Sequence, residues 1–225
     1  MKTLTSSRPD LLREAWKLGI TKEFLPEFDL ALETTQETVH HMYTVGEHIL
    51  HTLLEVRPDR ILRLTMLLHD IGKPYMKTMD ADGVAHFKGH PEKSSELANE
   101  ILHRLKFDND TIRKVTKLVR YHDHRMPVTP AHVRRAVHEI GEDLFLLYLE
   151  VRRADVAAQS MYQHKEKVAD IDGVEKLYPL QKLFFLIKFR MFQHQIQKMF
   201  QHLTNLFSRF HSGSDQIFTC HCQHL

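Results

Sequence analysis

The chain has 225 residues, 42% hydrophobic and 27% charged, with a formal net charge of +2. Such a composition is typical of one globular domain with a sizeable core. Residues 1–175 hold 25 Lys and Arg against 28 Asp and Glu, whereas the remainder nets +5. No run has the apolar length of a membrane span, and the first ten residues lack the apolar core of a signal peptide. We therefore expect a cytoplasmic protein with no membrane partner.

Apolar residues recur with a helical period along most of the chain, which predicts an all-α fold. Asp59 is placed to cap a helix that ends near Gly72. Residues 76–90 break the helical period, and their Asp-Gly step at 82–83 favours a small hairpin or an ordered loop.

Further helices are expected between residues 91 and 164. Pro91 suits the first position of a helix, and Asp110 can cap a helix over 111–124. Thr129 precedes a helix that stops at Gly141, and the next helix is expected over 142–164.

The composition changes after Tyr178. Residues 176–214 contain no Asp or Glu, eight of the thirteen Phe lie from residue 184 onward, and Cys220 and Cys222 are too close together to indicate a disulfide framework. One interpretation is a basic helix whose Phe face contacts the body or forms an oligomer; another is a tail translated from a shifted frame. We therefore divide the chain into a helical lead-in, a helical domain and a divergent basic tail, at 1–33, 34–178 and 179–225.

Helical spacing places several ionisable side chains on buried faces. His48, His122 and Asp155 each lie on the apolar stripe of a predicted helix, whereas His40 and His51 align with polar residues and are expected to be solvated. A single inward histidine is more often a hydrogen-bonded core residue than a ligand. The number of such inward-facing groups in this sequence nevertheless favours their being ligands.

The segment LTMLLHDIGKP, residues 64–74, ends an apolar helix with His69 and Asp70. An unpaired carboxylate among aliphatic side chains is strongly disfavoured, so Asp70 needs a cation or a hydrogen-bonded network. Imidazole and carboxylate together suit Fe, Mn, Ni, Co or Zn, and Mg is compatible with the carboxylates. The sequence predicts two divalent ions with Asp70 as the bridge, and the expected ligands are His48, His69, Asp70, His90, His122 and Asp155.

These residues resemble the HD superfamily of metal-dependent phosphohydrolases. His48, the His69-Asp70 doublet and Asp155 are similar to its H…HD…D signature. The segments HHMYTVGEHILHTL, LLHDIGKP, HFKGHPEKSSELANEIL, LVRYHDH and RRADVAAQ most resemble the HD domain attached to bacterial CCA-adding tRNA nucleotidyltransferases. The resemblance implies an HD-domain helical bundle in which these four residues bind metal, with His90 and His122 as the added ligands of binuclear members.

The resemblance covers roughly residues 34–165 and leaves part of the family pattern unmatched. A CCA-adding enzyme also needs a nucleotidyltransferase head with a Gly-Ser turn and paired aspartates on a strand. Asp170 and Asp172 follow a helical stretch without a Gly-rich turn, so we interpret them as a loop or a cap. By itself the chain is not expected to add CCA.

Three functions are compatible with this pattern. The first is hydrolysis of a phosphomonoester or phosphodiester of a nucleotide or RNA end, with tRNA as a candidate partner. Lys73 and Arg125 are then phosphate contacts or ordinary solvated charges, and Asp123 accepts a proton or, as we favour, orients His122. The second is a non-catalytic nucleic-acid-binding or assembly module that keeps a structural metal site. The third is oxidative chemistry at a di-iron centre.

Overall fold

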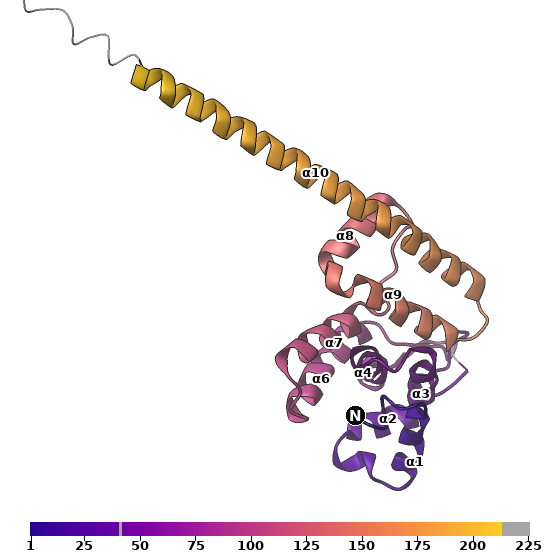
Figure 1. Ribbon diagram of the computed structural model, residues 1–225. Helices are drawn as coiled ribbons and strands as arrows, with labels where there is room; N and C mark the ends of the chain where they lie inside the picture. The colour runs from indigo at the N-terminus through magenta and orange to yellow at the C-terminus, as the bar shows by residue number, and fades with distance from the viewer. Residues whose placement is uncertain (41, 213–225) are drawn as a thin grey trace, which may run out of the picture. The chain divides into compact units, whose positions relative to one another are not determined.

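A computed structural model describes the backbone of residues 1–40 and 42–212 and the side chains of 1–40, 42–179 and 190–200. The chain separates into two compact units, Met1–Leu177 and Tyr178–Leu225. Figure 1 shows that helices dominate the described residues, which confirms the all-α prediction. The predictions for Cys220 and Cys222 lie outside the described residues, and the three predicted segment boundaries stay a prediction.

The elements follow one another along the chain with short connections. In order, they are η1 (Pro9–Leu11), α1 (Leu12–Lys17), η2 (Thr21–Glu23), α2 (Pro26–Glu33), α3 (Val45–Glu55), α4 (Arg60–Leu68), α5 (Lys73–Met76), β1 (Thr78–Met79), β2 (Ala85–His86), α6 (His90–Arg104), α7 (Asn109–Tyr121), α8 (Pro130–Ile140), α9 (Glu142–Ala157) and α10 (His164–Ser212). Among the described residues, no helix combines the length and apolar character that crossing a membrane requires.

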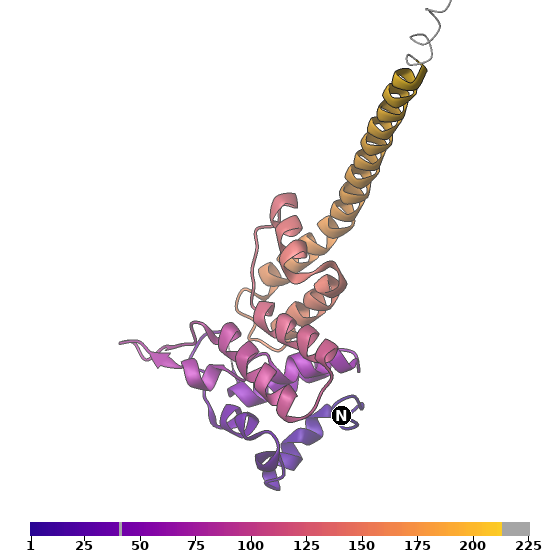
Figure 2. The ribbon, with the colours of Figure 1, turned by 90° about the vertical axis from the view of Figure 1, so that its left-hand side faces the viewer.

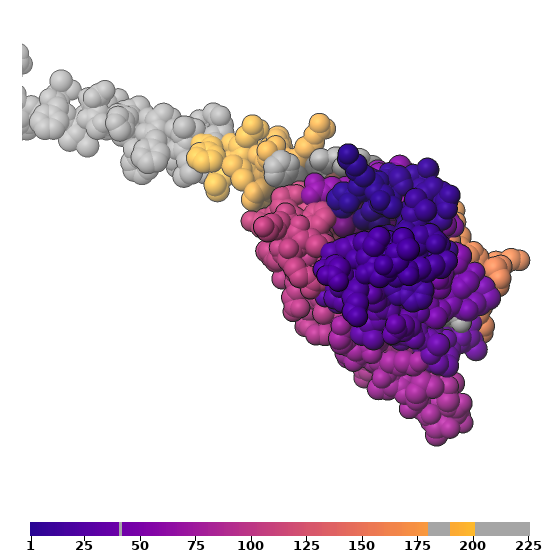
Figure 3. All heavy atoms as spheres, turned by 90° about the horizontal axis from the view of Figure 1, so that it is seen from below, coloured from indigo at the N-terminus to yellow at the C-terminus, as the bar shows by residue number. Residues whose placement is uncertain are grey.

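The core of the first unit surrounds α4. This helix packs against α3, α6, α7 and α9, and fully buried side chains such as Ile49, Leu62, Met66, Val119 and Val151 fill the space between them. Figure 3 shows the N-terminal residues, in indigo, covering one face of this unit. The C-terminal end of α4 therefore lies where several helices meet.

Helix α4 begins as predicted and ends earlier than predicted. The Asp59 carboxylate accepts hydrogen bonds from the backbone N–H groups of Ile61 and Leu62, at 2.9 and 3.0 Å, which confirms the cap. The helix ends at Leu68 instead of near Gly72. A continuous helix through Pro74 would bring the proline ring against the carbonyl group four residues earlier, so a turn separates α4 from α5.

Helices α7 and α9 also differ from the predictions, and α7 ends at Tyr121 instead of 124. Asp108, and not Asp110, caps α7, because its carboxylate accepts the backbone N–H of Thr111 at 2.9 Å. Helix α9 ends at Ala157 instead of 164. Beyond its end, the Ser160 hydroxyl and N–H donate to carbonyl groups of residues 39 and 40, bonds that a continuing helix would not allow.

The predicted hairpin is confirmed. Strands β1 and β2 pair antiparallel through Thr78 with His86 and Met79 with Ala85, and Gly83 supplies the positive φ of 75° that their turn requires. The N–H of Ala85 donates to the carbonyl group of Glu37 at 2.9 Å. This bond attaches the hairpin, seen at the edge of the helices in Figure 2, to the segment that precedes α3.

Candidate metal centre

The six predicted ligands converge at the C-terminal end of α4. Five of them are at most 4% exposed, and the His90 side chain is 12% exposed. They come from α3, the turn after α4, the start of α6, the end of α7 and α9, and they are His48, His69, Asp70, His90, His122 and Asp155. The structure thus brings together every residue of the predicted set, and their binding of metal stays a prediction.

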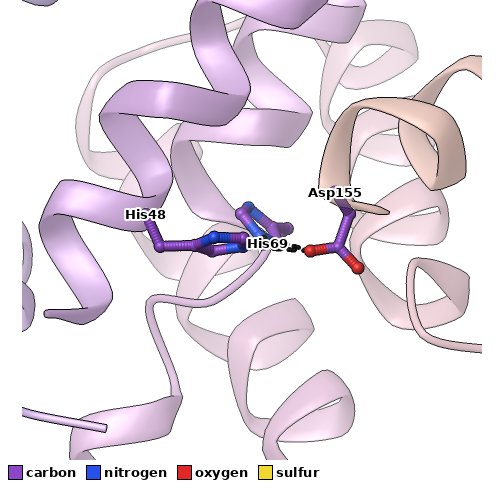
Figure 4. Close-up of side chains that lie close together, drawn as sticks. All are labelled: His48, His69 and Asp155. Carbon is purple, nitrogen blue, oxygen red and sulfur yellow. Dashed lines mark hydrogen bonds and ion pairs between the residues drawn. The ribbon is translucent and has the colours of Figure 1, made fainter. Parts of the chain in front are cut away.

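The ligating atoms form two groups. The first group consists of donor atoms of His48, His69 and Asp155, which all lie within 4.8 Å of one another. Figure 4 shows His48 on α3 pointing toward Asp155 on α9, with His69 beside them. Oδ1 of Asp155 lies 3.0 Å from Nε2 of His48 and 3.9 Å from Nε2 of His69. The second group contains Asp70, His90 and His122, within the same limit.

Asp70 contacts both groups with different oxygens. Its Oδ1 lies 3.3 Å from Nε2 of His90 and 3.4 Å from Nε2 of His122. Its Oδ2 lies 3.3 Å from Nε2 of His69 and 3.6 Å from Nε2 of His48. One carboxylate therefore faces two sets of donors, which is the placement that a bridging ligand requires.

The backbone determines which nitrogen of each imidazole faces the site. Every one of the four rings has Nδ1 within hydrogen-bonding distance of a backbone carbonyl oxygen. These pairs are His48 with Ala158 at 3.3 Å, His69 with Met66 at 2.8 Å, His90 with Phe87 at 2.8 Å and His122 with Val119 at 2.7 Å. Because a carbonyl oxygen only accepts, Nδ1 carries the proton and the Nε2 lone pair of the neutral ring points inward.

This arrangement needs a cation. Nε2 of His90 lies 3.2 Å from Nε2 of His122, and two lone pairs at that distance repel each other unless a proton or a metal ion lies between them. Among the described residues, neither Nε2 of His69 nor Oδ1 of Asp70 has a hydrogen-bond partner. Buried nitrogen and oxygen acceptors without donors fit divalent metal ions of the Fe, Mn, Co, Ni and Zn type.

Both carboxylates of the site are held in the ionised state. Burial raises the pKa of Asp70, but the neighbouring His69 and Lys73 outweigh burial and keep the pKa well below its usual range. Burial likewise opposes ionisation of Asp155, and the adjacent His48 holds its pKa well below the usual range. The site therefore offers two negative charges to a cation.

Lys73 differs from the solvated cation that was one interpretation of the sequence. Its side chain is buried, and its Nζ lies 2.7 Å from Oδ2 of Asp70 and 2.9 Å from Oε1 of Gln36. The ammonium group is thus part of the buried network around the predicted bridge. Gln36, which takes part in this network, was not found by sequence reasoning.

The orienting role expected of Asp123 is wrong. The Val119 carbonyl group, and not Asp123, receives the Nδ1 proton of His122. Asp123 instead faces two guanidinium groups, with Oδ1 3.5 Å from Arg125 and 3.5 Å from Arg152. Because His122 follows the last turn of α7, the nearest acceptor for its Nδ1 is a carbonyl group of that turn.

A cleft of about 560 Å³ opens onto the site. Its walls include Asp70, Asp155 and the cations Lys73, Lys88 and Arg125.

His40 also lines the cleft, which corrects the expectation that it is simply solvated. Helix α3 begins only at Val45, so the helical alignment used for His40 does not apply to it. Gln159, a further lining residue, lies in the RRADVAAQ segment and was not singled out.

Comparison with known proteins agrees with this geometry. A family model described as HD domain matches residues 38–170. The A-adding tRNA nucleotidyltransferase of Deinococcus radiodurans is 38% identical over 145 residues, which are 61% of this chain and 33% of that protein. The CC-adding tRNA nucleotidyltransferase of Thermus thermophilus is 35% identical over 130 residues, 55% of this chain and 30% of that protein.

A bifunctional uridylyltransferase/uridylyl-removing enzyme of Ruegeria pomeroyi is 29% identical over 137 residues, 49% of this chain and 13% of that protein. The aligned part thus amounts to a third or less of the length of each of these relatives.

Proposed function

The chain belongs to the HD domain family, and from this premise we propose that it is a metal-dependent phosphohydrolase acting on a phosphomonoester or phosphodiester of a nucleotide or RNA end. The observation that carries the proposal is the set of four imidazoles whose Nδ1 atoms face backbone carbonyl oxygens, leaving four Nε2 atoms around two ionised carboxylates. The likeness to tRNA nucleotidyltransferases supports a nucleotide or RNA substrate.

The residues present fit two divalent ions. When bound, such ions would neutralise phosphate charge and make water more acidic. His48, His69 and Asp155 would hold one ion, His90 and His122 the other, and Asp70 would contact both. The backbone carbonyl groups that bind Nδ1 keep each ring in its orientation, so the ligands need little rearrangement.

The cations of the cleft are suited to a phosphate group. Arg125 is more than half exposed, with its guanidinium 3.5 Å from Asp123, and can donate two parallel hydrogen bonds to phosphate oxygens. Lys88, on the loop after β2, is exposed on another part of the wall. Lys73 keeps Asp70 ionised from within the wall. Arg125 and Lys88 would thus bind and orient the phosphate group, Lys73 holds the charge of Asp70, and Asp123 holds Arg125.

The test is hydrolysis by protein that has been stripped with a chelator and reloaded with Mn, Ni, Co, Fe or Mg. We expect metal-dependent cleavage within a panel of nucleotide phosphoesters, with 2′,3′-cyclic and terminal phosphates favoured. Asp70→Ala should reduce the rate by orders of magnitude, because it removes the carboxylate shared by both groups, while circular dichroism shows an intact helical fold. If none of the phosphoesters is cleaved with any of these metals, the proposal is contradicted.

A second function is favoured by the charge of the chain after residue 175, which nets +5. In this alternative the protein is a non-catalytic nucleic-acid-binding module with a structural metal site. It predicts tRNA binding that weakens as salt rises and no phosphoester cleavage. Oxygen consumption by the iron-loaded protein would instead support the oxidative alternative.

A further inference from the structure

A chain of hydrogen bonds runs from the metal-facing Asp155 to a buried lysine. Nζ of Lys167, a side chain only 7% exposed, donates to Oε1 of Gln159 at 2.8 Å. Nε2 of Gln159 donates to Oδ2 of Asp155 at 3.0 Å. The other oxygen, Oδ1, faces Nε2 of His48 at 3.0 Å.

The donor and acceptor groups in this series of hydrogen bonds determine how the Gln159 amide is oriented. An ammonium group only donates, so Gln159 must turn its carbonyl oxygen toward Lys167 and its NH₂ group toward Asp155. Lys167 and Asp155 thus select the same orientation of the amide, and without Lys167 the Gln159 side chain would be held from one end only. By anchoring the carbonyl end of Gln159, Lys167 holds its NH₂ group in place against Oδ2 of Asp155, while Oδ1 faces His48.

The same ammonium group contacts His40. Nζ of Lys167 lies 3.5 Å from Nδ1 of His40, which makes Nδ1 the acceptor and leaves the ring proton on Nε2, the reverse of the four predicted ligands. Burial, with the positive charge of Lys167, lowers the pKa of His40 and favours the neutral ring. Ser160 holds the segment by donating to the carbonyl groups of Val39 and His40, at 2.6 and 2.9 Å.

We propose that Lys167 is a positioning residue with two effects: through Gln159 it sets the carboxylate of Asp155 for metal binding, and directly it makes His40 a hydrogen-bond donor to a phosphate oxygen in the cleft. Both groups line the same cleft, so one lysine organises a ligand of the metal and a contact of the substrate. The second effect rests on the proposed function, whereas the first concerns metal binding alone.

The first effect is tested with Co²⁺, whose visible absorption reports the geometry of its ligands. Lys167→Met and Gln159→Met keep an unbranched side chain of similar size and remove its hydrogen bonds. Each should weaken Co²⁺ binding about 10- to 100-fold, measured by competition with a chelator, and should change the spectrum. The double variant should lose no more affinity than either single variant, because the two residues act in one chain.

Lys165→Met is the matched control, since Lys165 lies two residues away and is exposed; it should keep the wild-type spectrum and affinity. If Lys167→Met does not fold, as judged by circular dichroism, Gln159→Met carries the test. A wild-type spectrum and affinity in a folded Lys167→Met or Gln159→Met variant overturns the positioning of Asp155.

The second effect is tested by titrating Co²⁺-loaded protein with inorganic phosphate and following the visible spectrum. His40→Phe keeps an aromatic ring and removes the donor, so it should weaken phosphate binding about tenfold. Unchanged phosphate binding in this variant overturns the role of His40. Wild-type protein that binds Co²⁺ and not phosphate contradicts both the proposed function and the role of His40, whereas an unchanged Co²⁺ spectrum in Lys167→Met contradicts the positioning of Asp155 alone.

Discussion

Nζ of Lys73 lies 2.7 Å from Oδ2 of Asp70, and both side chains are buried. The proposed bridging carboxylate thus has a built-in cation that stays with the protein whether or not metal is bound. A buried carboxylate that loses this counter-charge is left in an unfavourable environment, because the surrounding helices exclude water. The pair links the stability of the fold to the occupancy of the site.

Replacing Lys73 by methionine should therefore destabilise the metal-free protein more than the metal-loaded protein. Breaking a buried pair by removing one partner is worth about 3 to 5 kcal/mol, and metal ions beside Asp70 would replace part of the lost charge. The measurement is the free energy of unfolding in urea, with chelator and with saturating Mn²⁺. Equal destabilisation in both states would show that Lys73 does not share Asp70 with the metal.

Protein purified without chelator should contain close to two ions per chain by elemental analysis. His122→Ala should lower the content toward one ion, because it removes Nε2 from the group that contains Asp70 and His90. His124→Ala is the control, since His124 lies two residues away and is exposed. A His122→Ala protein that still holds two ions would show that this residue is not a ligand.

The cap of α7 should make stability depend on pH in the acid range. The backbone N–H and the hydroxyl of Thr111 donate to Asp108 and lower its pKa to about 2. Because the pKa is lower in the folded than in the unfolded chain, the cap stabilises fully above about pH 4 and is lost as the pH falls toward 2. The difference in Tm between wild type and Asp108→Ala should shrink over this interval. A difference that stays constant from pH 5 to pH 2 would argue that the carboxylate charge is unimportant.

A chain that ends at Tyr178 should keep its metal content. Every proposed ligand lies within the unit Met1–Leu177. The comparison is made on the soluble, folded fraction, checked by circular dichroism. Complete loss of metal from that fraction would place residues of the tail in the site.

Local sequence was sufficient to predict that these helices exist and which side chains on them point inward, but not where each helix ends. The caps at Asp59 and Thr129 depend on neighbours two or three residues away, so both were predictable. The inward faces of His48, His122 and Asp155 follow from the helical period, and all three are buried in the structure. The helical period gave a wrong prediction for His40, because this residue lies before the first residue of α3.

Tertiary structure decided what each inward group contacts. The packing of the helices determines which atom orients His122 and buries Lys73 against Asp70. It also brings Lys167 into contact with Asp155 through Gln159. Ser160 holds His40 from 120 positions further along the sequence. Helical periodicity determines the direction of a side chain relative to its own helix, whereas the partner it meets depends on segments that only the folded core brings together.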